Sequence, residues 1–208
     1  NGSMEGRKNM NRKGSPRVPC YLALAVITLI AGLVLGATYM LTKDPIAAQE
    51  RRKAEMARAA VMPEADAFRL LDAAGDDAVD WVYEALRDGA RVGYVAQGTG
   101  RGFGGEIEVI VGLRADGEIT GISVGGASFS ETAGLGAKAK DAAFTGGFFG
   151  KRAPLTVVKA GEARSESTVD AITSATITSK AVNDTVTRVS EAVRALVEPS
   201  ENAEGDAQ

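Results

Sequence analysis

Residues 20–41, CYLALAVITLIAGLVLGATYML, constrain the fold of this chain most strongly because they form one apolar run without a charged side chain. At about 1.5 Å per residue, a helix of this length spans roughly 33 Å, enough to cross the hydrocarbon core of a bilayer. We therefore expect a transmembrane helix over residues 20–41. The polar and basic residues 1–19 before it are expected to form a disordered tail.

A cleaved signal peptide is the alternative interpretation, because it too has a basic start and an apolar centre. The apolar run is longer than a usual signal peptide core, and no small-x-small cleavage site follows it, which favours a retained anchor. Gly32 and Gly36 form a GxxxG pattern that could let another helix approach closely. In a span rich in glycine and alanine, the same pattern also arises incidentally.

The orientation of the span does not follow from charge, because basic residues are nearly balanced on its two sides. They are Arg7, Lys8, Arg12, Lys13 and Arg17 before the span, and Lys43, Arg51, Arg52, Lys53 and Arg58 after it. Long domains translocate largely regardless of charge. The simplest expectation is a single-pass protein of the cell membrane with a cytoplasmic N-terminus and an extracytoplasmic C-terminal domain.

The composition excludes several kinds of chemistry. The chain has no histidine and one cysteine, which excludes histidine-ligated zinc, a Ser-His-Asp triad, intrachain disulfides and an iron–sulfur cluster built from this chain alone. Residues 44–208 carry 18 basic and 26 acidic side chains, which argues against a nucleic-acid partner. We expect no metal site, and any chemistry must come from a bound group or from carboxylates and hydroxyls.

The pattern after the apolar run predicts an α+β fold. Residues 42–62 are rich in Ala, Glu, Lys and Arg and predict a juxtamembrane helix, with Pro63 ending it. Residues 64–80 predict a second helix and a loop. From Trp81 onward the segments are strand-like, and two Asp-Gly pairs between apolar runs predict antiparallel hairpins. The expected strands are 81–87, 92–98, 106–114 and 119–126, with turns at Asp88-Gly89 and Asp116-Gly117.

Two segments of the domain allow two interpretations each. Residues 98–106, GTGRGFGGE, are too rich in glycine to predict a strand, and form either a flexible connection or a backbone that passes close to a planar ligand or another chain. Residues 128–150 predict a loop followed by a short helix. Phe144, Phe148 and Phe149 belong to the core or line an aromatic wall, and the core is favoured.

The C-terminal part predicts a strand over 155–160, an extended segment over 168–172 and a helix over 179–196 that packs on the sheet. Its apolar stripe consists of Val182, Val186, Val189, Val193, Leu196 and Val197. Residues 198–208 predict an acidic, disordered tail. The expected architecture is an N-terminal transmembrane helix followed by one domain over 63–197, with an antiparallel sheet flanked by helices.

Residues 170–180, DAITSATITSK, place a cluster of hydroxyls just before the terminal helix. They belong to Thr173, Ser174, Thr176, Thr178 and Ser179. A helix N-terminus has unpaired N–H groups and the positive end of the helix dipole, so these hydroxyls could flank a bound phosphate. A Ser/Thr cap of a structural helix is the alternative.

The chain resembles the FMN-binding domain family in three motifs that follow the apolar run: RGFGGEIEVIVGL at 101–113, SETAGLGAK at 130–138 and DAITSATITSKAV at 170–182. The family includes the G subunits of Rnf-type ion-translocating ferredoxin:NAD oxidoreductase complexes, with the C subunits of Na⁺-translocating NADH:quinone oxidoreductases as relatives. The resemblance implies a membrane-anchored electron-transfer subunit with covalent FMN, which is not active alone. It also implies three partners: other subunits of such a complex, a flavin transferase during maturation and the lipid bilayer.

The resemblance also implies roles for single residues. Thr176 matches the threonine whose hydroxyl forms a phosphoester with FMN. Asp170 matches the acid of the motif and Thr173 its Ser/Thr position, and these two are the elements that the transferase is expected to recognise. Ser174 stands where the family often has glycine, and Ala133 replaces a proline beside the flavin. Ser179 is then the expected helix cap. The other residues expected to contact the cofactor are Thr173, Ala175, Ile177, Thr178, Glu131, Thr132, Gly134, Leu135, Gly136 and Gly104, together with Ser174.

A flavin holds one or two electrons by itself, so this function needs no histidine or thiol from the protein. A phosphoester tether also suits a compartment in which lost FMN could not be replaced. Two alternatives remain open: a flavinylated carrier of another extracytoplasmic electron-transfer chain, such as an NADH:quinone oxidoreductase, and a non-catalytic membrane-anchored scaffold whose hydroxyls only cap a helix.

Overall fold

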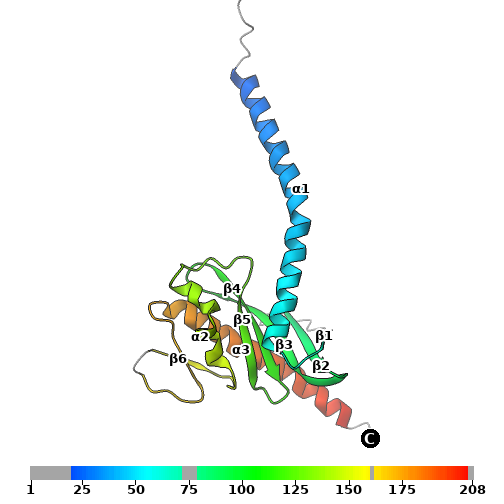
Figure 1. The fold of residues 1–208 in the computed structure, drawn as a ribbon, viewed down its shortest axis with the longest axis vertical. Coiled ribbons are helices and arrows are strands. Elements are labelled where there is room, and N and C mark those ends of the chain that lie inside the picture. The colour runs from blue at the N-terminus through cyan, green and yellow to red at the C-terminus, as the bar shows by residue number, and fades with distance from the viewer. Residues whose placement is uncertain (1–19, 72–78, 160–161, 206–208) are drawn as a thin grey trace, which may run out of the picture. The chain divides into compact units, whose positions relative to one another are not determined.

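The computed structural model describes residues 20–71, 79–159 and 162–205 (Figure 1). It divides into two compact units, residues 1–49 and 50–208, which are described separately. The predicted tail over 1–19 lies outside the described residues. Helix α1, Cys20–Val61, has no break between the two helices that we expected, and Pro45 lies inside it.

The first unit contains the candidate membrane span. Within the described residues, the one helical stretch long and apolar enough to cross a membrane is Tyr21–Lys43, with a mean hydropathy of 2.2. Its threonine hydroxyls donate hydrogen bonds to backbone carbonyls one turn earlier: Thr28 to Leu24, Thr38 to Val34 and Thr42 to Thr38. Polar side chains bonded in this way are compatible with an apolar surrounding.

The second unit is built on a five-stranded antiparallel sheet in the order β1-β2-β3-β4-β5. The strands are β1 Ala67–Leu71, β2 Trp81–Arg87, β3 Ala90–Arg101, β4 Glu106–Arg114 and β5 Ile119–Gly125. The α+β fold and both predicted hairpins are confirmed. Asp88 and Gly89 have φ values of 51° and 79° and form a two-residue turn, while Gly117 with φ 81° closes the turn between β4 and β5.

Two predictions in this region are wrong. A second helix and a loop were expected over 64–80, but residues 67–71 of this segment form β1 and pair with β2, where Arg69 also forms an ion pair with Glu84. Residues 98–101 were expected in a loop but continue β3, and only 102–105 turn. Glycine is needed at position 100 because α3 packs closely on the strand there: a Cβ would lie 2.2 Å from the hydroxyl of Thr185. Long-range pairing therefore overrode local composition.

Helix α3, Thr176–Gly205, lies across one face of the sheet and packs against β3 and β4 (Figure 1). It starts earlier and ends later than the predicted 179–196. The predicted apolar stripe is buried at Val182, Val186, Val189 and Val193, whereas Leu196 is exposed, contrary to expectation. This stripe and one side of the sheet form the main core.

Short elements complete the edge of the sheet near β5. They are the 3-10 helix η1 Gly136–Lys140, helix α2 Ala142–Thr145, the 3-10 helix η2 Gly146–Phe148, and the parallel pair β6 Thr156–Val158 and β7 Thr168–Asp170. Phe144 and Phe148 are buried in edge-to-face contact, which confirms them as core. Phe149 is exposed and belongs to neither predicted group.

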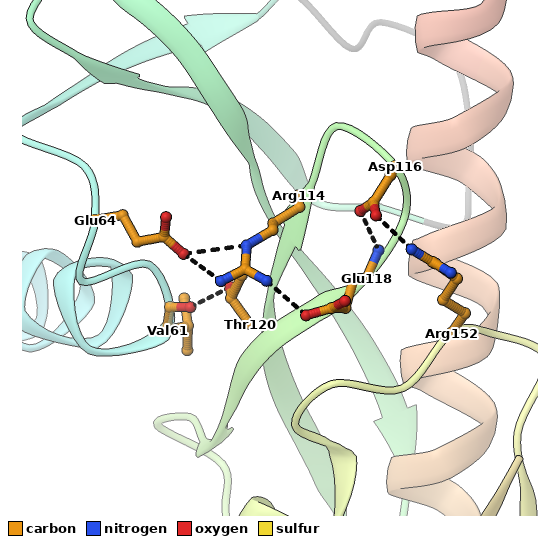
Figure 2. Close-up of polar contacts among 7 residues, drawn as sticks. All are labelled: Val61, Glu64, Arg114, Asp116, Glu118, Thr120 and Arg152. Atoms are coloured by element: carbon orange, nitrogen blue, oxygen red, sulfur yellow. Dashed lines mark hydrogen bonds and ion pairs between the residues drawn. The ribbon is translucent and has the colours of Figure 1, made fainter. Parts of the chain in front are cut away.

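The opposite face of the sheet is closed by the last residue of α1 and the residue that follows it. Val61 and Met62 are buried against Ala85, Val95 and Ile110. The buried Thr120 hydroxyl donates a 2.5 Å hydrogen bond to the Val61 carbonyl (Figure 2). The C-terminal turn of α1 is therefore part of the packing of this domain.

Charged side chains lie around the contact between the end of α1 and the sheet (Figure 2). Arg114 bridges Glu64, at 2.7 Å, and Glu118, at 2.6 Å, and these partners raise the pKa of its guanidinium. In the β4–β5 turn, a hydrogen bond from the Glu118 N–H and the neighbouring Arg152 lower the pKa of Asp116. Ion pairs and hydrogen bonds of charged side chains therefore stabilise the turn at neutral pH.

Candidate functional site

The chain enters α3 through a tight turn over residues 172–175. The N–H of Ala175 donates to the Ile172 carbonyl at 3.0 Å, and Ser174 has a φ of 64°. A positive φ at the third position of a turn favours glycine. The backbone at this position therefore suits glycine, which the resemblance led us to expect where this chain has Ser174.

Ser179 does not cap α3 as predicted, because it lies inside the first turns of the helix. It is fully buried, and its hydroxyl accepts a hydrogen bond from the N–H of Ile172 and donates one to the carbonyl of Ala175, both at 2.9 Å. The residue before the helix is Ala175, whose methyl group offers no capping oxygen. The hydroxyl of Ser179 instead ties the entry turn to the helix.

The remaining hydroxyls of the segment differ in environment. Thr173 and Ser174 are exposed in the turn, and Thr178 is buried and donates to the Glu131 carboxylate. Thr176 is half-buried as the first residue of α3. It therefore combines access with a position at the positive end of the helix dipole.

Glu131 joins the three segments that were predicted to surround a cofactor. Its Oε1 accepts a hydrogen bond from the N–H of Gly104, and its Oε2 accepts one from the hydroxyl of Thr178, each at 3.0 Å. The loop after it is closed by the Thr132 carbonyl, which accepts from two N–H groups, and it needs the φ of 79° at Gly134. The 102–105 turn, the 131–136 loop and the start of α3 therefore meet at one place.

A hollow of about 390 Å³ opens at this meeting point. Ten residues line it: Phe103, Glu131, Thr132, Leu135, Gly136, Ser174, Ala175, Thr176, Ile177 and Thr178. Three of the lining side chains are apolar and exposed, with fractions of 73% for Phe103, 58% for Ile177 and 41% for Leu135. Exposed apolar groups around a concave site are typical of ligand pockets.

Nine of these lining residues were predicted from the sequence, and Phe103 was missed. The sequence feature that could have indicated it is a single aromatic residue flanked by glycines, RGFGG, since glycines have no side chains that could cover it. Gly104 belongs to the site through its N–H to Glu131, while Gly134 shapes the loop. Thr173 lies in the entry turn and does not line the hollow.

Asp170 also lies outside the hollow, at the end of β7. It is half-exposed and forms a 2.9 Å ion pair with Arg164, a residue that sequence reasoning did not single out. Its position is on the approach to the entry turn, so it is accessible to another molecule. This is compatible with a recognition role and not with direct contact to a group in the hollow.

The residues present fit an FMN group chemically. Apolar side chains can cover the faces of a planar ring. The N–H groups in the first turn of α3 have no capping side chain, because Ala175 precedes the helix, so they are available to a phosphate. Thr176 supplies a hydroxyl at this end of the helix. Gly104 has room only for a hydrogen, since a Cβ there would lie 2.2 Å from the Ser130 carbonyl.

Comparison with known proteins identifies the family. The FMN-binding domain family matches residues 102–191, which include all three segments of the site. The G subunit of the proton-translocating ferredoxin:NAD(+) oxidoreductase complex of Clostridium ljungdahlii is 35% identical over 172 residues, 82% of this chain and 88% of the relative. This chain belongs to the family of these G subunits. The family resemblance predicted from the three motifs is confirmed.

Another relative and a solved structure add detail. The G subunit of the Na(+)-translocating ferredoxin:NAD(+) oxidoreductase complex of Acetobacterium woodii is 35% identical over 180 residues, 79% of this chain and 86% of the relative. The C subunit of the Na(+)-translocating NADH-quinone reductase from Parabacteroides distasonis aligns with a TM-score of 0.47 and 28% identity, over 53% of this chain and 59% of that one. In this chain, the part that matches the FMN-binding domain lies entirely within the second unit.

Proposed function

We propose that this chain is a membrane-anchored electron-transfer subunit of an ion-translocating ferredoxin:NAD oxidoreductase complex, with FMN joined by a phosphoester to Thr176. The observation that carries the proposal is the position of Thr176, which is half-buried, opens α3 and lines the hollow. The FMN-binding family match and the names of the relatives support the cofactor and the type of complex. Neighbouring subunits are the expected electron partners.

The protein residues would bind and orient the cofactor. The N–H groups at the start of α3 favour a phosphate on Thr176, since the helix dipole is positive there. Phe103, Leu135 and Ile177 would shield the ring from water, because they are apolar and line the same hollow. FMN, when bound, supplies the capacity to accept and release one or two electrons.

Anchoring and maturation complete the proposal. The stretch Tyr21–Lys43 would hold the chain in the cell membrane as a single span, with the second unit on the extracytoplasmic side. Asp170 would be read by a flavin transferase, which fits its exposure outside the hollow. Such an anchor would keep the redox group near the membrane and beside its partner subunits.

Intact-mass measurement of the full chain coexpressed with a flavin transferase tests the proposal. The wild-type chain and Thr176→Ser are expected to gain the mass of FMN less water, and Thr176→Ala is expected to gain nothing, because it lacks the acceptor hydroxyl. Ser167→Ala, which removes an exposed hydroxyl outside both the 170–176 motif and the hollow, is the matched control and keeps the flavin.

The opposite results have clear meanings. If Thr176→Ala still gains the mass of FMN less water, the flavin is attached to a residue other than Thr176. A colourless wild-type chain, in the presence of an active transferase, would leave only the scaffold interpretation.

A further inference from the structure

Two glycines lie directly against the carboxylate of Glu131, beside the hollow that this residue lines. A Cβ on Gly102 would lie 2.2 Å from Oε1, and a Cβ on Gly136 would lie 2.1 Å from Oε2. Two glycines from different segments therefore shape the space around this one side chain. Larger residues at either position would push the carboxylate out of place.

Both oxygens of the carboxylate are engaged by donors of the protein. Oε1 accepts from Gly104 in the 102–105 turn, and Oε2 accepts from Thr178 in the first turn of α3. Thr178 is 1% exposed, so its hydroxyl has no solvent to bond in place of Glu131. A charged acceptor shared between a backbone N–H and a buried hydroxyl makes strong, directional hydrogen bonds.

We propose that Glu131 is a positioning residue that clasps the 102–105 turn and the 131–136 loop to the start of α3, and is not itself a ligand of the cofactor. This inference rests on the proposed function for the identity of the cofactor. Its negative charge is favourable beside the N-terminus of α3. The same charge would repel a phosphate on Thr176, which argues against direct contact with that group.

Hydrogen exchange of the full chain made without a flavin transferase tests the clasp independently of the cofactor. Glu131→Ala is expected to speed exchange in the 102–106 segment by about tenfold, because the Gly104 N–H loses its acceptor. Glu131→Gln retains a carbonyl oxygen for Gly104 and an amide that can donate to Thr178, so it should stay close to wild type. Glu106→Ala removes an exposed carboxylate of the same hairpin and is the matched control.

The flavinylated full chain separates positioning from ligation. Iodide quenching of flavin fluorescence is expected to rise about threefold in Glu131→Ala and in Thr178→Val, because the hollow loosens when the clasp is lost. Glu131→Gln is expected to match wild type both in quenching and in the midpoint potential of the flavin. A direct ligand would show the reverse pattern, with the potential of Glu131→Gln shifted and quenching unchanged.

The outcomes keep this inference distinct from the proposed function. Wild-type exchange rates in Glu131→Ala, or a shifted potential in Glu131→Gln, would overturn the clasp. If Glu131→Ala fails to fold, Thr178→Val tests the other half of the clasp through the quenching measurement, because it removes the bond to Oε2. Failure of the wild-type chain to acquire flavin would refute the proposed function but would leave the exchange result valid.

Discussion

At the scale of single residues, Ser174 adopts a left-handed backbone conformation that glycine adopts more easily, and this conformation lowers the stability of the fold. A non-glycine residue in the left-handed region is disfavoured by about 1–2 kcal/mol, and Ser174 has a φ of 64°. Ser174→Gly should raise the free energy of unfolding by about 0.5–1 kcal/mol, since glycine relieves the strain but adds entropy to the unfolded chain. Ser174→Val should lower it by more than about 1 kcal/mol. Thermal unfolding of the full chain in detergent measures both.

The neighbouring position supplies the control for this prediction. Thr173→Gly adds the same flexibility to the unfolded chain without relieving a positive φ, so it should not stabilise the protein. Equal stability of Ser174→Val and wild type would show that the turn does not hold its left-handed conformation in solution.

At the scale of elements, the contact between β3 and α3 depends on Gly100. A Cβ at this position would lie 2.2 Å from the Thr185 hydroxyl oxygen and 3.1 Å from the Ala181 carbonyl. Thr185 cannot turn away freely, because its hydroxyl donates to that carbonyl at 2.8 Å. Gly100→Ala should therefore destabilise the domain by about 1–3 kcal/mol in urea unfolding.

A second substitution makes the cause of this loss testable. Thr185→Ala removes the clashing oxygen and should restore part of the stability in the Gly100→Ala background, a non-additivity expected of residues in contact. Gly125→Ala on β5, where a Cβ would meet nothing within 4 Å, is the matched control. Additive losses in the double variant would contradict the packing explanation.

At the scale of the whole molecule, the end of α1 completes the second face of the sheet. Val61 and Met62 are 1% and 0% exposed, so a fragment that begins at residue 64 leaves Ala85, Val95 and Ile110 uncovered. Losing two buried side chains should cost about 3–6 kcal/mol relative to a fragment of residues 50–205. Urea unfolding of the two fragments measures the difference, and equal midpoints would show that the domain folds without the helix end.

Gly112 provides a check on this prediction without truncation. A Cβ there would lie 2.4 Å from both the Val61 carbonyl oxygen and the Thr120 hydroxyl oxygen. Gly112→Ala should therefore destabilise the 50–205 fragment more than the shorter one, in which only the contact with the Thr120 side chain remains. The predicted domain boundary at residue 63 remains a prediction, and this pair of measurements tests it directly.

Local signals in the sequence were sufficient for features that depend on neighbouring residues. The Asp-Gly pairs predicted both hairpins, because positive φ values there are a local requirement. The helical spacing of the valines in α3 correctly predicted that they are buried on one face of the helix. The motifs at 101–113, 130–138 and 170–182 were enough to place the chain in its family.

Only the tertiary structure decided how the hydroxyls of residues 170–180 differ, because their environments come from residues far away in the chain. Glu131 engages Thr178, Ser179 bonds back to the entry turn, and Thr176 alone opens the helix at the hollow. The pairing of β1 and the path of β3 through its glycines depended equally on distant partners. The sequence by itself determined the family and the hydroxyl-rich segment, and long-range packing decided which of these hydroxyls are buried and which one lies at both the helix start and the hollow.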